Sequence, residues 1–150
     1  MREAIFSILG PLDGLRVLDL FAGSGALGIE ALSRGAAAAI FVDEDPRAIA
    51  AVRANLAAIG KEAGVYRRDA LAFLAAPVAA ANRFDVAFVD PPYSSARRLA
   101  RPLSERLPTV LSATGRIVSE SDKRAPLELT IQPVDIRVYG DTQIAIHHAG

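Results

Sequence analysis

The most informative stretch of this chain is Asp19-Leu20-Phe21-Ala22-Gly23-Ser24-Gly25, which completes an apolar run that begins at Arg16. That run is typical of a strand, and a helical pattern at 26–34 follows the glycines directly. With Gly28 the loop matches the spacing G-x-G-x-x-G, in which glycine lets a ligand approach the backbone and permits a positive φ. We therefore expect a cofactor-binding loop where the first strand ends and a helix begins.

Strand and helix patterns alternate along the rest of the chain. Runs such as Val86-Ala87-Phe88-Val89 are apolar on both faces, as central parallel strands covered by helices are. A tight turn at Gly140-Asp141-Thr142 joins two alternating strands near the C-terminus. Strands are expected at 16–21, 38–43, 65–68, 84–89, 116–120, 135–139 and 143–147, and helices in a short leading segment ending at Gly10 and at 26–34, 46–60, 70–81 and 96–107.

This order of elements predicts an α/β fold. It is a doubly wound, mostly parallel sheet of the Rossmann-like kind, with an antiparallel C-terminal hairpin at one edge. No linker or repeat divides the chain, so we expect residues 1–150 to form one domain.

The composition excludes several classes of protein. Hydrophobic residues make up 51% and charged residues 23%, which indicates a folded chain rather than a disordered one. No apolar run approaches the roughly 18 residues of a membrane span. With no cysteine there is no disulfide framework and no thiolate chemistry. We expect a cytoplasmic, monomeric protein with no membrane partner and no metal.

The charge balance does not by itself indicate a nucleic-acid partner. The chain has 17 basic and 17 acidic residues, whereas proteins that bind nucleic acids usually have a basic surplus. The predicted helix after residue 93 carries a local group of arginines, Arg97, Arg98 and Arg101. These arginines are interpreted either as a solvated helix face or as an RNA contact.

Acidic residues stand at the ends of three successive predicted strands. Asp19 lies in the first strand just before the glycine loop, Asp43 ends the second, and Asp69 follows the third. Three carboxylates on one rim favour a cationic ligand, such as the ammonium and sulfonium of S-adenosylmethionine, and would repel the pyrophosphate of NAD. Asp43 is placed to accept hydrogen bonds from ribose, and Asp69 to meet the adenine amino group. The competing interpretation is that all three are turn and cap residues.

The segment Asp90-Pro91-Pro92-Tyr93 follows the strand at 84–89. Two prolines make a stiff turn and offer no backbone N–H, so the Asp90 carboxylate and the nearby carbonyls form a surface of acceptors only. Such a surface orients an exocyclic –NH₂, and Tyr93 can stack on the ring that carries it. Asp90, Pro91, Pro92 and Tyr93 are therefore the expected catalytic segment of an amine methyltransferase. A strand-ending turn with a packing aromatic is the alternative.

Taken together, the chain resembles the bacterial methyltransferases that modify a guanine N2 in 16S ribosomal RNA. The resemblance covers nearly all residues and rests on Arg2 to Leu9, on Asp19 to Gly35, on Asp90 to Tyr93, and on Tyr139-Gly140-Asp141-Thr142. It implies S-adenosylmethionine as cofactor and 16S rRNA, or the assembling small ribosomal subunit, as partner. The residues it implies at the donor site are Asp19, Phe21, Ala22, Gly23, Gly25, Asp43, Glu44, Asp69, Ala70 and Asp90.

One departure from that family concerns the N-terminus. Members carry some tens of residues, several of them basic, before the Arg-Glu pair, whereas here Met1 directly precedes Arg2. We therefore expect the chain to lack the family's N-terminal RNA-binding extension, which puts its RNA affinity in question.

Three other functions remain open at this point. DNA adenine-N6 methyltransferases also use Asp-Pro-Pro-Tyr, but usually with an added recognition domain. A non-catalytic S-adenosylmethionine-binding module and an oxidoreductase on the same fold are the others, and the second of these is disfavoured by Asp19. His147 and His148 fall at the end of the last predicted strand, and we expect both to be exposed rather than catalytic.

Overall fold

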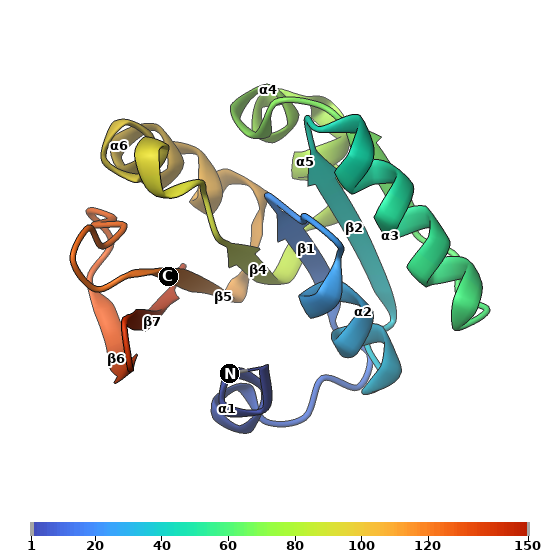
Figure 1. The fold of residues 1–150 in the computed structure, drawn as a ribbon, viewed down its shortest axis with the longest axis horizontal. Coiled ribbons are helices and arrows are strands. Elements are labelled where there is room, and N and C mark those ends of the chain that lie inside the picture. Colours follow the sequence, from blue (N-terminus) through green and yellow to red (C-terminus); the bar gives the residue numbers. More distant parts are fainter. Residues whose placement is uncertain (1, 150) are drawn as a thin grey trace.

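The strands form one twisted sheet with helices on both faces, as a computed structural model of the protein describes for residues 2–149 (Figure 1). Within those residues the sheet has seven strands in the order β3-β2-β1-β4-β5-β7-β6. The five strands β3, β2, β1, β4 and β5 run parallel to one another. Strand β7 pairs antiparallel with both β5 and β6. The strands are β1 (Arg16–Leu20), β2 (Ala38–Asp43), β3 (Gly64–Arg67), β4 (Phe84–Val89), β5 (Leu111–Asp122), β6 (Pro133–Tyr139) and β7 (Thr142–His148).

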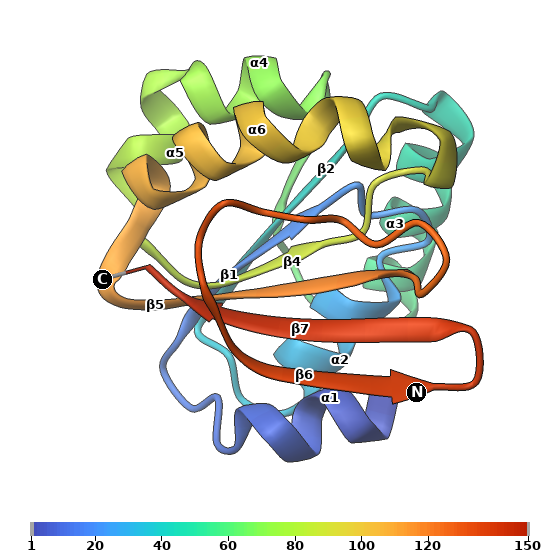
Figure 2. The ribbon, with the colours of Figure 1, turned by 90° about the vertical axis from the view of Figure 1, so that its left-hand side faces the viewer.

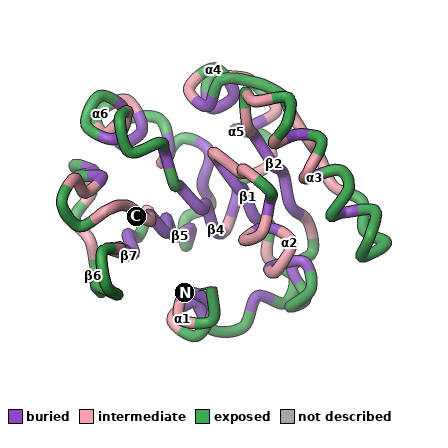
Figure 3. The backbone as a smooth tube through the Cα atoms, in the orientation of Figure 1, coloured by how far each residue is buried: buried purple, intermediate pink, exposed green. Residues whose placement is uncertain are grey.

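The helices divide between the two faces of this sheet, and each face has its own apolar cluster. One cluster packs α1 (Arg2–Leu9), α2 (Ala26–Ser33) and α3 (Pro46–Ala58) against the sheet, and the other packs α4 (Ala70–Ala75), α5 (Pro77–Asn82) and α6 (Ala96–Arg106). Two 3₁₀ turns, η1 (Tyr93–Ser95) and η2 (Leu107–Val110), flank α6. Figure 3 shows the central strands as almost continuously buried. The predicted doubly wound sheet is therefore confirmed.

The predicted helix at 70–81 is wrong in one respect, because it is two helices. Pro77 has no N–H to continue α4, and it holds Ala76 in an extended conformation with φ −79° and ψ 147°. Proline is favoured at the first position of a helix, so α5 begins at Pro77 itself.

Strand β5 is also longer than expected. It begins at Leu111 rather than at Arg116, and its register against β4 shifts between Phe84 and Val86. The residues before Arg116 are mostly small or polar, so they carry no apolar alternation that would indicate a strand.

The C-terminal hairpin forms as predicted, but His147 is not exposed. Figure 2 shows β7 lying between β5 and β6, so it is an inner strand rather than an edge. His147 is 2% exposed and its Nδ1 lies 2.7 Å from the carbonyl oxygen of Ile131, whereas His148 is exposed. Sequence reasoning placed this strand at the edge because it comes last in the chain. Among residues 2–149, no helix has both the length and the apolar character to cross a membrane.

Candidate active site

The loop after β1 has a tightly specified backbone. Phe21 adopts a φ of +62°, which is rare for a bulky residue, and Gly23 a φ of +58°. The Gly23 N–H donates to Oδ2 of Asp43 at 2.9 Å, and the Ala22 N–H donates to the carbonyl of Val42 at 3.0 Å. These bonds tie the loop to the end of β2. A strained aromatic residue held in this way is a feature often found at functional sites.

Asp19 lies beneath this loop, with its carboxylate facing α2. It is 3% exposed, and its Oδ2 accepts a hydrogen bond from the Gly28 N–H at 2.9 Å. Burial, opposed by the hydrogen bond from Gly28 and reinforced by the negative charges of Asp90 and Asp43, raises the pKa of Asp19 to about 7. A positive charge placed near Asp19 would therefore stabilise its ionised form.

Glycine is required at position 28 by packing rather than by its backbone angle. A Cβ built there would lie 2.4 Å from Cε1 of Phe41, too close for any side chain. The third glycine of the predicted motif therefore lets α2 approach β2 closely, which keeps the Gly28 N–H within reach of Asp19.

Asp43 and Asp69 accept backbone hydrogen bonds at a turn and at a helix N-terminus. The other oxygen of Asp43 accepts the Asp45 N–H at 2.9 Å, and Asp69 caps α4 by accepting the Ala72 N–H at 3.0 Å. Both residues are thus turn and cap residues, and both also line the cavity described next. Because each carboxylate oxygen has more than one lone pair, a backbone bond leaves capacity for a ligand.

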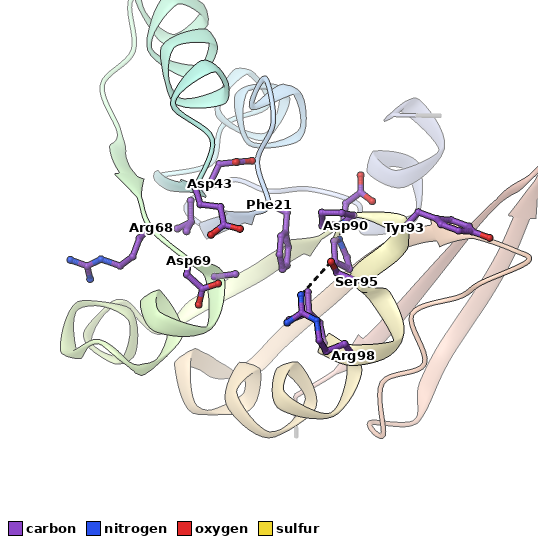
Figure 4. A pocket seen from close by; sticks show the side chains of 14 residues that line it. Phe21, Asp43, Arg68, Asp69, Asp90, Tyr93, Ser95 and Arg98 are labelled. Atoms are coloured by element: carbon purple, nitrogen blue, oxygen red, sulfur yellow. Dashed lines mark hydrogen bonds between the residues drawn. The ribbon is translucent and has the colours of Figure 1, made fainter.

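A cavity of about 340 Å³, here called the central cavity, opens above the carboxyl ends of β1, β2 and β4 (Figure 4). That volume is within the range of small-molecule sites. In Figure 4 the ring of Phe21 lies between Asp43 and Asp69 on one side and Asp90 on the other. Of the residues predicted for the donor or the catalytic segment, the cavity is lined by Phe21, Asp43, Glu44, Asp69, Ala70, Asp90, Pro91, Pro92 and Tyr93.

Two further cavities share Asp90 with the central one. The α1-side cavity, of about 350 Å³, also contains Asp19, Phe21 and Ala22. The hairpin-side cavity, of about 260 Å³, contains Pro91 and Tyr93 and extends to the turn of the β6–β7 hairpin. Asp90 lines all three cavities, so the three cavities meet at this residue. Gly23 and Gly25 shape the loop but line none of these three cavities.

Asp90 is open to these cavities, yet the protein around it removes part of its water. This partial desolvation, with the negative charge of Glu120, raises the pKa of Asp90 to about 6. The neighbouring Tyr93 is 63% exposed and its ring projects away from Phe21 (Figure 4). The prolines between them place an ionisable group inside the site and an aromatic face at its mouth.

Glu120 is the residue that sequence reasoning missed. It lies on β5, lines both the α1-side and the hairpin-side cavities, and has its own pKa raised by burial. A signal was present, because Glu120 ends the predicted strand at 116–120 in the way that Asp43 ends its own. Read across the sheet, the acidic residues at the strand ends, here called the carboxylate rim, are Asp69, Asp43, Asp19, Asp90 and Glu120.

The three arginines of α6 do not act as one patch. Arg98 lines the central cavity and its guanidinium donates to Ser95 Oγ at 3.4 Å (Figure 4). Arg101 pairs with Glu105 at 3.3 Å on the exposed face. Arg97 lines a groove that begins at Tyr93 and is bordered on its other side by Arg124. Arg98 therefore shares a cavity with Asp90 and the two prolines, whereas Arg97 shares a groove with Tyr93 alone of that segment.

This sheet order, with an antiparallel seventh strand and a glycine loop after the first, defines a class I methyltransferase fold. A family model described as conserved hypothetical protein 95 matches residues 1–148, and the chain belongs to that family. The chain is 42% identical to YlbH of Bacillus subtilis, a candidate rRNA methyltransferase by its name, over 98% of this chain and 83% of that protein. These findings confirm the predicted family and fold.

Further relatives agree. The chain is 37% identical to the ribosomal RNA small subunit methyltransferase D of Escherichia coli, over 81% of this chain, and the match spans only 58% of that protein. The solved structure of yhhF from Escherichia coli, a candidate methyltransferase by its title, has a TM-score of 0.81 at 30% identity, over 97% of this chain and 83% of that one. A 16S rRNA N2 G1207 methyltransferase of Thermus thermophilus, solved with AdoMet and guanosine, shares the fold with a TM-score of 0.76 at 22% identity, over 97% of this chain and 41% of that one.

Proposed function

We propose that this protein transfers a methyl group from S-adenosylmethionine to the exocyclic N2 amine of a guanine in 16S ribosomal RNA. The observation that carries the proposal is the position of Asp90, which lines a cavity suited to the donor and a second cavity that opens at Tyr93. Membership of a family with rRNA methyltransferases among its named relatives supports ribosomal RNA as the substrate.

The residues on the donor side fit S-adenosylmethionine. The central cavity is large enough for a nucleoside, and Asp43 and Asp69 offer acceptors for ribose hydroxyls and an amino group. Asp19, whose pKa is raised to about 7 by burial, is stabilised as a carboxylate by a cationic ligand. When bound, S-adenosylmethionine supplies a methyl carbon already activated by its sulfonium.

On the acceptor side, the chain's own task is alignment and proton removal. Pro91 and Pro92 lack N–H donors, so the turn presents acceptors to a planar amine and fixes its nitrogen toward the donor. The amine loses one proton for the methyl group it gains. Asp90, with a pKa of about 6, is ionised at neutral pH and is placed to receive that proton. The exposed ring of Tyr93 supports the base by stacking.

The test is methyl incorporation from labelled S-adenosylmethionine into naked 16S rRNA and into assembling small subunits, both from cells that lack this protein. Digestion and mass spectrometry then identify the methylated nucleoside. N2-methylguanosine supports the proposal. Methyladenine in DNA would support the adenine-N6 alternative, and donor binding without any incorporation would support a binding module. Calorimetry with S-adenosylmethionine and NAD tests the cofactor, and a preference for NAD would contradict it.

Asp90→Ala separates catalysis from binding in the same assay. This variant should bind the donor with near-normal affinity, because the other rim carboxylates remain, while incorporation falls by about 100-fold or more. Retained turnover would contradict the role given to Asp90.

A further inference from the structure

The α1-side cavity has an unusual charge composition. It is lined by three carboxylates, Asp19, Asp90 and Glu120, and among its described lining residues there is one cation, Arg2. Arg2 forms no ion pair with any carboxylate of residues 2–149. The function proposed above gives the carboxylates a ligand but leaves Arg2 without a role.

Arg2 is held at this cavity by the packing of α1. Ile5 is fully buried, and the ring of Phe6 lies 5.8 Å from that of Phe88 on β4, centroid to centroid. The guanidinium of Arg34 lies 4.8 Å from the Phe6 ring, over its face. At the other end of the helix, Nη1 of Arg116 donates to the Leu9 carbonyl at 2.8 Å. These contacts fix a helix that takes no part in the sheet, and they bring its first described residue to the cavity.

The rim carboxylates act in opposite ways on the two charged groups of an α-amino-acid ligand. Its ammonium is attracted by the rim carboxylates, but its own carboxylate is repelled by them. A guanidinium resolves the conflict, because its planar donors match a carboxylate in a bidentate way. Among the described lining residues, only Arg2 can supply that contact.

We propose that Arg2 binds the α-carboxylate of the amino-acid tail of the methyl donor, in the α1-side cavity. The inference rests on the proposed function, since it assumes a donor that carries this tail. It also gives α1 a role, which is to hold the guanidinium of Arg2 beside the carboxylates of this cavity.

Isothermal titration tests this with two ligands that differ by the carboxylate alone: S-adenosylmethionine and its decarboxylated analogue. In Arg2→Met the affinity for S-adenosylmethionine should fall by about 10- to 100-fold, the range of a lost hydrogen bond between charged groups. Affinity for the decarboxylated ligand should be unchanged or higher, because that ligand is more cationic and the variant has lost a positive charge. Arg2→Lys should fall between the wild type and Arg2→Met.

The matched control is Arg53→Met, an exposed arginine on α3 that lines none of the three cavities and should bind both ligands as the wild type does. Because Arg2 is itself exposed, the thermal midpoint of Arg2→Met should match that of the wild type. Equal losses for the two ligands, or no loss for either, would overturn the inference while leaving the proposed function intact. Failure of the wild type to bind S-adenosylmethionine would overturn both.

Discussion

Asp90 and Glu120 are neighbours near the carboxyl ends of β4 and β5, where partial burial and the charge of Glu120 raise the pKa of Asp90. The register of the two strands explains this proximity, because Val89 pairs with Ser119 and an acidic residue follows each of them in the sequence. Both side chains line the hairpin-side and the α1-side cavities. Two like charges therefore share one site, and the charge of Glu120 makes Asp90 easier to protonate than it would be alone.

The pH dependence of methyl transfer should report this pair. If ionised Asp90 accepts the proton, kcat/KM falls as the pH drops through about 6. In Glu120→Gln the like charge is gone, the ionised form of Asp90 is favoured, and the inflection moves to lower pH. Single-turnover rates from about pH 5 to about pH 8 measure it. An inflection that stays in place or moves upward would show that Glu120 does not act on the catalytic carboxylate.

Asp19→Asn should trade donor affinity for stability. The asparagine oxygen can still accept the Gly28 N–H, and the variant carries no buried charge. Because the pKa of Asp19 is raised from 3.8 to about 7, the wild type loses stability as the pH rises from about 4 to about 7, by at most about 4 kcal/mol in total. The variant should therefore become relatively more stable from about pH 5 to about pH 8 in denaturant titrations.

Donor binding should move in the opposite direction in Asp19→Asn. The loss of a carboxylate beneath the loop weakens the affinity for S-adenosylmethionine, which calorimetry measures. In the wild type near neutral pH, a cationic donor lowers the pKa of Asp19 and releases protons, so the observed heat should depend on the ionisation enthalpy of the buffer. A variant that binds the donor as tightly as the wild type, with the same proton release, would exclude Asp19 from the site.

Tyr93→Ala should affect the RNA and not the fold. The side chain is 63% exposed, so the free energy of unfolding should change by less than about 0.5 kcal/mol. Loss of a stacked base costs about 1–3 kcal/mol, so KM for RNA should rise by roughly 5- to 150-fold while donor affinity is retained. Tyr93→Phe keeps the aromatic face and serves as the control. Equal effects of both substitutions would indicate that the hydroxyl, not the ring, is the group that matters.

Local patterns were sufficient for most of the fold. Strands β2 and β4 have the predicted bounds because each contains a dense apolar run, at 38–42 in β2 and at 86–89 in β4. Helix α3 begins at Pro46 after the predicted Asp45 cap. The error at 70–81 was local, because Pro77 separates α4 from α5. The error at β7 came from tertiary context. The position of β7 between two other strands is set by sheet order, which no local pattern encodes, and this is why His147 was misplaced.

The candidate site shows the same division. The two motifs identify the residues around Phe21 and Asp90 because their chemistry is written in consecutive positions. Glu120 and Arg2 reach the site only through the pairing of β5 with β4 and the packing of α1, so their proximity to Asp90 could be seen only in three dimensions. The two roles of Asp43, which holds the loop and lines the cavity, also follow from the fold. Its Oδ2 accepts a hydrogen bond from the N–H of Gly23, which lies 20 positions away in the sequence.

His147 offers a final prediction, on stability alone. Burial lowers its pKa below 6.5, and its Nε2 has no hydrogen-bond partner among the described residues. The native ring is therefore neutral, with Nδ1–H donating to the Ile131 carbonyl. As pH falls below about 6.5 the unfolded chain takes up a proton that the native state does not, so this histidine's contribution to stability is lost toward acid.

His147→Asn removes the titration and keeps a donor near the Nδ1 position. The variant should be less stable than the wild type by about 1–2 kcal/mol at about pH 7.5, because packing is lost, and the gap should narrow as the pH drops to about 5.5. Asp19 and Asp90 titrate in the opposite sense but are common to both proteins, so the difference isolates His147. Denaturant titrations across this range measure it, with exposed His148→Asn as the control. A gap that widens toward acid would mean that the native ring is protonated and paired rather than buried and neutral.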